Sequence, residues 1–283
     1  MRDQGSLKNS HHKFTSYKTP FSKIRIRQFS DLLCVSEGVT YLQYPGLSQN
    51  RTLVHAIFAR RGGVSEPPYD TLNTSYTVGD RPENVSANLL KIKEVVGAAH
   101  LVFMNQSHGD QVLALHQGSF EPSGKVPLAD AMITDIPRIG LMVKQADCQG
   151  VVLYDPKQGV VATVHCGWRG NVQNILAGVV TRMEKDFGCE GPDILAALSP
   201  SLGPCCAEFL SHNEIFPRGF DRFEVRENYF DLWALSCSQL VEAGVREENI
   251  EIAAICTRCR TDLFYSYRGE GATGRFATVA MLL

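Results

Sequence analysis

The fold is decided by residues 139–188, which read IGLMVKQADCQGVVLYDPKQGVVATVHCGWRGNVQNILAGVVTRMEKDFG. The first half of this stretch contains three short apolar runs separated by turn residues, at 139–143, 151–154 and 160–164. Runs of this length that are rich in Val, Ile and Leu are typical of buried strands. Three of them in close succession predict a sheet at the centre of the molecule.

The second half of the stretch predicts a helix over residues 172–187, because apolar residues recur there at helical spacing. We expect Asn171 to be the N-cap, since its side chain can accept hydrogen bonds from the first turn. We expect Gly188 to end the helix, since glycine readily adopts the left-handed conformation of a C-cap.

Strands and helices continue to interleave on both sides of this stretch. Similar patterns predict strands over 52–59, 194–198, 250–255 and 276–282, and helices over 82–96 and 231–243. There is no internal repeat and no linker-like segment. We therefore predict an α/β (α+β) fold, with a single layered domain over residues 31–283 in which helices flank mixed β-sheets. Residues 1–30 are polar and basic and are predicted to be a flexible N-terminal tail.

The composition is that of a globular protein. Hydrophobic residues make up 44% of the chain, and the net charge of -2 argues against binding to nucleic acid. No apolar run is long enough to cross a bilayer, and no secretory signal is visible. Nine cysteines scattered over 283 residues fit a reducing compartment better than a disulfide framework. We expect a cytoplasmic protein without a nucleic-acid or membrane partner, whose oligomeric state the sequence does not indicate.

Three segments at the ends of predicted strands concentrate unusual residues: NQSHGD at 105–110, QADC at 145–148 and HCGWRG at 165–170. They offer two imidazoles, His108 and His165, and the thiol of Cys148. Imidazole and thiolate are ligands that zinc and copper prefer, and ligands from three separate segments fit a catalytic site with one open position. A zinc ion in such a site lowers the pKa of its water to about 7.

The residues alone leave two other interpretations open. Cys148 could be a thiolate nucleophile with a neighbouring histidine as its base. Alternatively, these side chains could simply be packed and hydrogen-bonded, as histidines at strand ends often are.

Two further patterns also have more than one explanation. Cys256-Thr257-Arg258-Cys259 is a CxxC motif, but adjacent Cys205 and Cys206 do not form a matching pair, so we expect both pairs to be structural. The glycine-rich residues 269–274 lie between Arg268 and Arg275. They form either a simple turn or a loop that binds an anion such as phosphate.

Taken together and in order, the motifs of this chain resemble those of the YfiH-type family of multicopper polyphenol oxidase or laccase-like proteins, which process purine nucleosides. The resemblance extends from about residue 58 to the C-terminus. It rests on RRGGVS at 60–65, YDTLN at 69–73, VGD at 78–80, NQSHG at 105–109, ADC at 146–148, HCGWRG at 165–170, GPCC at 203–206 and TGR at 273–275.

The resemblance implies a YfiH-like layered α/β fold and a metal, usually zinc, held by His108, Cys148 and His165, which would also be the catalytic residues. It further implies phosphorolysis of adenosine, inosine, guanosine and methylthioadenosine, and deamination of adenosine. The partners would be a purine nucleoside and phosphate. Candidate substrate-binding residues are Arg60 and Arg275 for phosphate, and Asn73 and Gln106 for the base and ribose.

The chain departs from the family pattern in three places. RGEG at 268–271 stands where Arg-Arg-Asp-Gly is common, so one arginine is missing near the proposed phosphate site. Gln145 replaces a usual Thr, and Cys166 replaces a usual Ala beside a proposed metal ligand.

The leading hypothesis is therefore a zinc-dependent purine nucleoside phosphorylase with adenosine deaminase activity. Copper-dependent polyphenol oxidation is the weaker metal hypothesis, since eight histidines are too few to assemble several copper centres convincingly. The remaining alternatives are a cysteine hydrolase or amidase that uses Cys148, and a nucleoside-binding protein without turnover.

Overall fold

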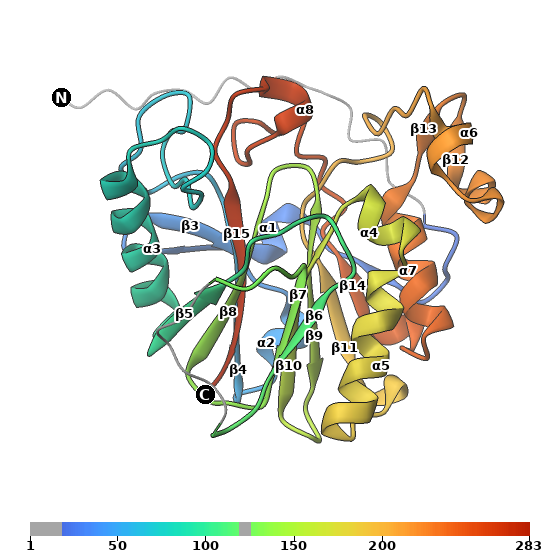
Figure 1. Cartoon of the computed structure of the whole chain (residues 1–283), viewed down its shortest axis with the longest axis horizontal. Coiled ribbons are helices and arrows are strands. Elements are labelled where there is room, and N and C mark those ends of the chain that lie inside the picture. Colours follow the sequence, from blue (N-terminus) through green and yellow to red (C-terminus); the bar gives the residue numbers. More distant parts are fainter. Residues whose placement is uncertain (1–18, 119–125) are drawn as a thin grey trace.

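The computed structural model describes residues 19–118 and 126–283, which form two β-sheets packed face to face between helices (Figure 1). One sheet has seven strands in the order β1(Arg25–Ile26), β14(Ile250–Ile252), β11(Leu195–Leu198), β9(Gln149–Asp155), β10(Val160–Cys166), β7(Ala131–Thr134), β6(Val112–Leu115). The other has six, in the order β2(Leu33–Ser36), β3(Val39–Leu42), β4(Leu53–Phe58), β15(Phe276–Leu282), β8(Ile139–Gln145), β5(His100–Phe103). A short hairpin joins β12(Glu224–Arg226) to β13(Tyr229–Phe230).

Both sheets contain parallel and antiparallel pairs, which confirms the predicted α/β class with mixed sheets flanked by helices. The α-helices of the described residues are α1(Phe29–Leu32), α2(Pro45–Ser48), α3(Pro82–Val96), α4(Trp168–Val172), α5(Ile175–Phe187), α6(His212–Ile215), α7(Leu232–Glu242) and α8(Tyr267–Glu270). Short 3-10 helices span Gly191–Asp193, Arg218–Phe223 and Glu247–Asn249.

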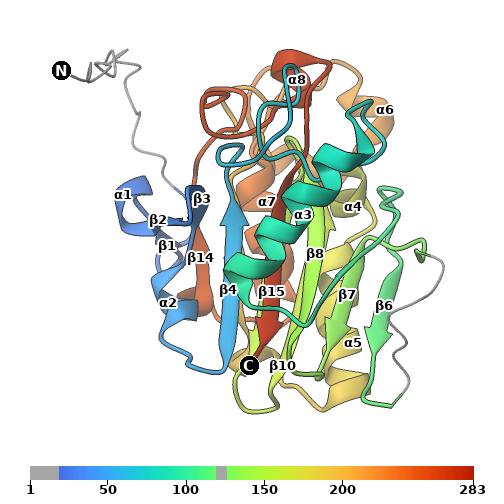
Figure 2. The same cartoon turned by 90° about the vertical axis from the view of Figure 1, so that its left-hand side faces the viewer.

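The layers follow from where the apolar side chains point. Side chains from the facing surfaces of the two sheets form one core, which includes Leu141, Val143, Val152 and Tyr154. The outer face of the seven-stranded sheet packs on α5, and the outer face of the six-stranded sheet packs on α3 (Figure 2). The central strands are therefore buried on both faces, which explains why they read as continuous apolar runs and not as alternating patterns.

Most predicted elements are confirmed with small shifts at their ends. Helix α3 begins at Pro82 and ends before Gly97, whose φ of 68° closes the helix as a left-handed C-cap. The prediction of one helix with Asn171 as its N-cap is wrong. Asn174, with φ of 55°, separates α4 from α5, while the Asn171 side chain is buried and donates to Ser236 Oγ at 2.8 Å and Gln239 Oε1 at 3.0 Å.

The fold also begins earlier than the predicted end of the tail at residue 30. Arg25 and Ile26 pair in parallel with β14, and the Arg27 guanidinium forms an ion pair with the buried carboxylate of Glu251. Two residues are too few to give a periodic apolar pattern, so this strand is set by its tertiary partner. Residues 1–18 of the predicted tail lie outside the described residues, and the extent of the domain over 31–283 stays a prediction.

Among the described helices, none combines the length with the apolar character that crossing a membrane requires.

Candidate active site

Cys148 lies in the turn that crosses from one sheet to the other. Strand β8 of the six-stranded sheet ends at Gln145, and β9 of the seven-stranded sheet begins at Gln149. Cys148 thus lies where the chain passes between the two sheets, and the turn from β8 to β9 is at the end of the molecule where α4 and α8 lie (Figure 1).

Asp147, the residue before Cys148, has a strained backbone conformation in this turn. Asp147 has φ of 85°, which is uncommon for a residue other than glycine. Its carboxylate accepts hydrogen bonds from Thr257 Oγ1 at 2.7 Å, Ser266 Oγ at 2.7 Å and the Arg268 backbone N–H at 2.6 Å. Because three contacts determine the position of Asp147, the direction of the Cys148 side chain is set as well.

Two histidine side chains lie close to the Cys148 thiol. His165 is the penultimate residue of β10, and His108 follows β5 with φ of 60°. One ligand atom from each of His108, Cys148 and His165 lies within 4.8 Å of the other two. Gly167 makes the approach possible, because a Cβ at this position would lie 2.7 Å from Cys148 Sγ and 3.4 Å from His108 Cδ2.

A buried carboxylate orients both histidines. Asp130, which is fully buried, accepts from His165 Nδ1 at 2.8 Å and from the His108 backbone N–H at 3.0 Å. Its second oxygen accepts from the backbone N–H groups of Ser107 and Gly109 and from the Ser107 hydroxyl. The bond to Nδ1 leaves Nε2 of His165 as the nitrogen that can face a metal, which is the usual carboxylate–histidine arrangement of metal sites.

The electrostatics favour charged side chains in this group. Burial alone would raise the pKa of the Cys148 thiol, but the charge of His165 and hydrogen bonds from His108 and His165 outweigh it, and the pKa falls to about 6. Burial likewise disfavours the Asp130 carboxylate, yet the hydrogen bonds from His165 and Gly109 lower its pKa to about 2. Both groups are therefore anionic at neutral pH.

The donor set fits a transition metal. Two imidazoles and one thiolate are zinc and copper ligands, and three protein ligands leave a fourth position open, as in catalytic zinc sites. Among the described residues, the other group of His, Cys, Asp or Glu side chains close enough to hold a metal contains four cysteines and no histidine. The described residues thus present one imidazole-containing site, where a multicopper oxidase needs several.

A cavity of about 610 Å³ opens onto the three side chains. This volume lies within the range of small-molecule sites. Its wall combines aromatic rings with cationic side chains, namely Trp168, Phe209 and Tyr267 with Lys144, Arg169, Arg268 and Arg275. Such a lining suits a ligand that carries both a flat ring and negative charge.

The structure divides the predicted substrate-binding residues into two groups. Gln106 and Arg275 line the cavity with the three metal-ligand candidates. The Gln106 amide, however, is engaged at both ends by the backbone of Lys144, with distances of 2.7 and 2.8 Å, so it holds the end of β8. Arg275 Nη1 is anchored on the carbonyls of Thr273 and Gly274.

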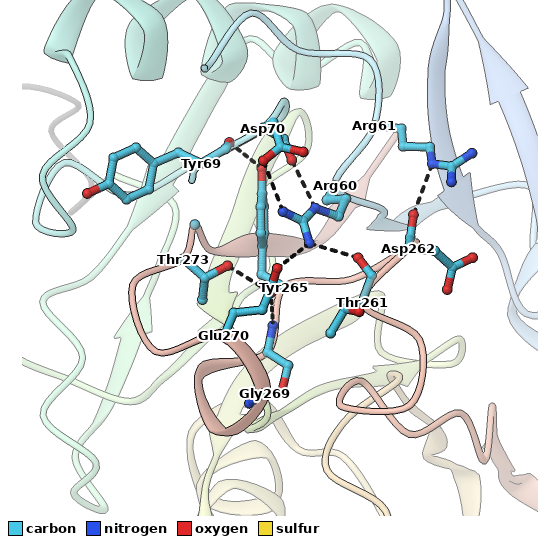
Figure 3. A network of polar contacts seen from close by, with 12 residues as sticks. Arg60, Arg61, Tyr69, Asp70, Thr261, Asp262, Tyr265, Gly269, Glu270 and Thr273 are labelled. Atoms are coloured by element: carbon cyan, nitrogen blue, oxygen red, sulfur yellow. Dashed lines mark hydrogen bonds and ion pairs between the residues drawn. The ribbon is translucent and has the colours of Figure 1, made fainter. Parts of the chain in front are cut away.

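Arg60 and Asn73 do not line the cavity, in contrast to what the sequence suggested. The buried Arg60 guanidinium donates to the Asp70 and Thr261 carbonyls and forms an ion pair with Glu270 at 2.7 Å (Figure 3). Asn73 is fully buried and donates to Asp80 Oδ2 at 2.9 Å. Both side chains hold loops together, and Glu270, at the site of the sequence departure, is the partner of Arg60.

The other two departures from the family pattern also have structural explanations. Both residues border the cavity, but successive residues of a strand point to opposite faces, and the Cys166 side chain is buried in the core cluster that contains α5. The buried Gln145 amide donates to Thr278 Oγ1 at 2.6 Å across the paired strands β8 and β15.

Two groups of site residues were not predicted from the sequence. Asp130 is an isolated acid within the apolar segment 128–134, and that contrast is the signal that could have found it. The cavity residues Lys144, Phe209 and Tyr267 have no comparable signal, because only the fold brings their segments together.

Residues 54–283 match the family model described as multi-copper polyphenol oxidoreductase laccase. The chain belongs to this family.

Curated relatives that share this laccase-type sequence carry a different name. A purine nucleoside phosphorylase of Bacteroides thetaiotaomicron is 31% identical over 270 residues, covering 89% of this chain and 99% of that protein. Purine nucleoside phosphorylase YfiH of Escherichia coli K12 is 32% identical over 237 residues, covering 79% and 91%.

Solved structures of laccase-type relatives share the fold. The YfiH protein of Bacillus licheniformis aligns with a TM-score of 0.78 at 28% identity, over 88% of this chain and 97% of that one. YlmD of Geobacillus stearothermophilus aligns with a TM-score of 0.77 at 25% identity, over 89% and 98%. The predicted YfiH-type resemblance is confirmed.

Proposed function

We propose that this laccase-type protein is a zinc-dependent purine nucleoside phosphorylase that also deaminates adenosine. The observation that carries the proposal is the meeting of His108, Cys148 and His165 at the wall of an aromatic and cationic cavity. The names of the curated relatives, at about 30% identity, support the phosphorylase part of the proposal.

His108, Cys148 and His165 would hold the metal. When bound, zinc would supply a Lewis acid that polarises an oxygen of substrate or water. Asp130 keeps the proton of His165 on Nδ1 and thereby directs Nε2 toward the metal position. Before a metal binds, the charge of the protonated His165 outweighs burial and lowers the pKa of Cys148 to about 6, so the thiolate is present without a separate base. The proton on His165 Nε2 would be replaced by a zinc ion.

Phosphorolysis breaks the bond between the purine nitrogen and C1′ of the ribose and forms a bond from C1′ to a phosphate oxygen. Arg275, Lys144 and Arg268 are the cavity cations that would hold the phosphate. Phe209 and Tyr267 would stack on the purine. Positioning the two reactants side by side is the main contribution that such residues make to the rate.

The direct test is a chromatographic product assay on metal-quantified protein. Zinc-loaded wild type with adenosine and phosphate is expected to release adenine and ribose 1-phosphate, and with adenosine alone to form inosine and ammonia. Inosine, guanosine and methylthioadenosine are the further phosphorolysis substrates to measure. If zinc-loaded wild type forms no product from any of these nucleosides, the proposal is wrong.

A second candidate is a cysteine hydrolase or amidase, which is favoured by a lowered Cys148 pKa beside two histidines. It predicts activity that survives a chelator and is lost on alkylation of Cys148. The zinc-dependent proposal predicts the opposite results: a chelator removes activity, and bound zinc protects the Cys148 thiol from alkylation. A copper-dependent phenol oxidase would instead require copper and oxygen, and product formation from nucleosides under nitrogen would argue against it.

Arg275→Met is expected to raise the KM for phosphate by about 10-fold to 100-fold, because a charge-assisted contact contributes about 1.5–3 kcal/mol. The matched variant is Arg60→Met. The sequence suggested Arg60 as a phosphate-binding residue too, but this buried arginine does not line the cavity. The Arg60→Met substitution is expected to lower the free energy of unfolding by about 1–3 kcal/mol, since it leaves the partly exposed Glu270 carboxylate and the Thr261 carbonyl without the buried guanidinium. Steady-state kinetics and denaturant unfolding of both variants measure the contrast. A larger phosphate effect in Arg60→Met than in Arg275→Met would contradict the assignment.

A further inference from the structure

Four cysteines from two distant parts of the chain meet in one cluster. Cys205 and Cys206 lie in the loop after β11, and Cys256 and Cys259 lie in the loop after β14. Their four Sγ atoms all lie within 4.8 Å of one another, and none of the four forms a disulfide. The sequence suggested only that both pairs are structural, and the structure brings the two pairs together.

The distances between the sulfur atoms suit a single tetrahedral metal. Cys259 Sγ lies 3.7 Å from Cys205 Sγ and 3.6 Å from Cys206 Sγ. Four thiolates at the usual zinc–sulfur distance of about 2.3 Å would be about 3.8 Å apart. A disulfide, with its bond of about 2.05 Å, would join only two of the four sulfurs. A four-iron cluster would need more space, because its iron and sulfide ions lie between the cysteines.

The backbone around the sulfurs is built to bring the two loops together. The Ser201 N–H donates to the Ile255 carbonyl at 3.1 Å, and the Thr257 N–H donates back to the Ser201 carbonyl at 3.0 Å. Gly203 permits the contact, since a Cβ there would lie 3.0 Å from Cys256 Cβ. This pairing holds the first pair of cysteines against the second independently of any ion.

We propose that Cys205, Cys206, Cys256 and Cys259 bind a structural zinc ion, in addition to the metal that His108, Cys148 and His165 would hold. Four thiolates close the coordination shell and leave no position for water or substrate, which is the mark of a structural site. A dication also removes the repulsion that four thiolates packed this closely would otherwise exert.

The position of the site gives this zinc a role in shaping the cavity. Thr257, which lies between two of the ligands, donates to Asp147 Oδ1 at 2.7 Å. The Leu202 N–H donates to the Asp147 carbonyl at 2.8 Å, and Leu202 itself lines the cavity. The two loops that the zinc joins thus hold the residue that precedes Cys148. The zinc is expected to stiffen this wall.

Metal analysis of the full-length protein tests the proposal. Wild type purified from zinc-supplemented cells without chelator is expected to contain about two zinc ions per chain. Cys206→Ser, which changes a half-buried ligand, is expected to lose about one zinc per chain and to unfold at a lower Tm, and to keep the zinc held by Cys148. The matched control is Cys34→Ser, another half-buried cysteine outside the cluster, which should keep both ions.

Two outcomes would overturn the proposal. One is a zinc content in Cys206→Ser equal to that of wild type. The other is a thiol titration of denatured wild type that finds two thiols too few until a reductant is added, which would identify a disulfide.

A second measurement leaves all four cysteines of the cluster unchanged. In the Cys148→Ala protein, which lacks a ligand of the other site, one equivalent of Co²⁺ is expected to give the strong visible bands of tetrahedral tetrathiolate cobalt. If these bands are absent at saturating Co²⁺, the four cysteines do not form a metal site. Either result is independent of whether the protein acts on nucleosides.

Discussion

Cys148→Ala is expected to lose the metal of the histidine–cysteine site and to lower kcat/KM for phosphorolysis by about 10³-fold, which corresponds to about 4 kcal/mol. Cys148 supplies the only anionic ligand of this group: without a metal the protonated His165 stabilises its thiolate against burial, and a zinc ion would take the place of the proton on Nε2. Removing Cys148 leaves two neutral donors, which bind zinc weakly. The measurements are zinc content after dialysis and the rates of adenine and inosine formation.

Cys166→Ala is the matched control for this variant. Cys166 lies next to the ligand His165 but packs in the core under α5, so its loss removes apolar contacts and no ligand. We expect it to lower the free energy of unfolding by about 1 kcal/mol and to leave zinc content and kcat/KM near wild-type values. If both variants lost zinc equally, the effect would come from the fold and not from ligation.

This contrast shows what the sequence could and could not predict about the site. The motifs identified His108, Cys148 and His165, because unusual residues at strand ends stand out against apolar runs. The opposite directions of His165 and Cys166 follow from strand geometry once β10 is known to extend through residue 166. The predicted strand ended at residue 164, so this consequence was missed.

The elements that were predicted correctly have local signals at their ends. Helix α3 has a proline at its first position and a glycine after its last, and β15 spans the predicted residues 276–282. The break between α4 and α5 has no such signal. It depends on Asn171, whose amide is held by Ser236 and Gln239 of α7, about 65 residues further along the chain.

The same reason explains why the four-cysteine cluster and Asp130 were missed. The pair Cys205 and Cys206 lies near the pair Cys256 and Cys259 because β11 and β14 are parallel neighbours in the sheet. The spacing of the cysteines in the sequence does not indicate this pairing. Asp130 lies 35 residues from His165 in the sequence. Motif spacing can propose metal ligands, but the groups that orient those ligands come from the tertiary fold.

Asp130→Asn is therefore expected to have the second-largest effect, a weakening of zinc affinity by about 10-fold to 100-fold. The amide oxygen can still accept from His165 Nδ1, but the amide nitrogen would then face three donors, from Ser107 and Gly109. The His108 loop would be displaced, and His165 would lose the negative charge that fixes its proton. Competition with a chromophoric chelator measures the affinity.

Asp155→Asn is the matched control, because Asp155 is a similarly buried carboxylate at the opposite end of β9 that accepts from the nearby Lys157 and Gln158 N–H groups and contacts no metal-ligand candidate. Its zinc affinity should equal that of wild type. Activity at saturating zinc then distinguishes a residue that orients a metal ligand from a residue that is a ligand itself. Asp130→Asn should recover most of its kcat as zinc is added, whereas Cys148→Ala should not. Failure of Asp130→Asn to recover at any zinc concentration would mean that Asp130 acts on the substrate itself and not through the orientation of His165.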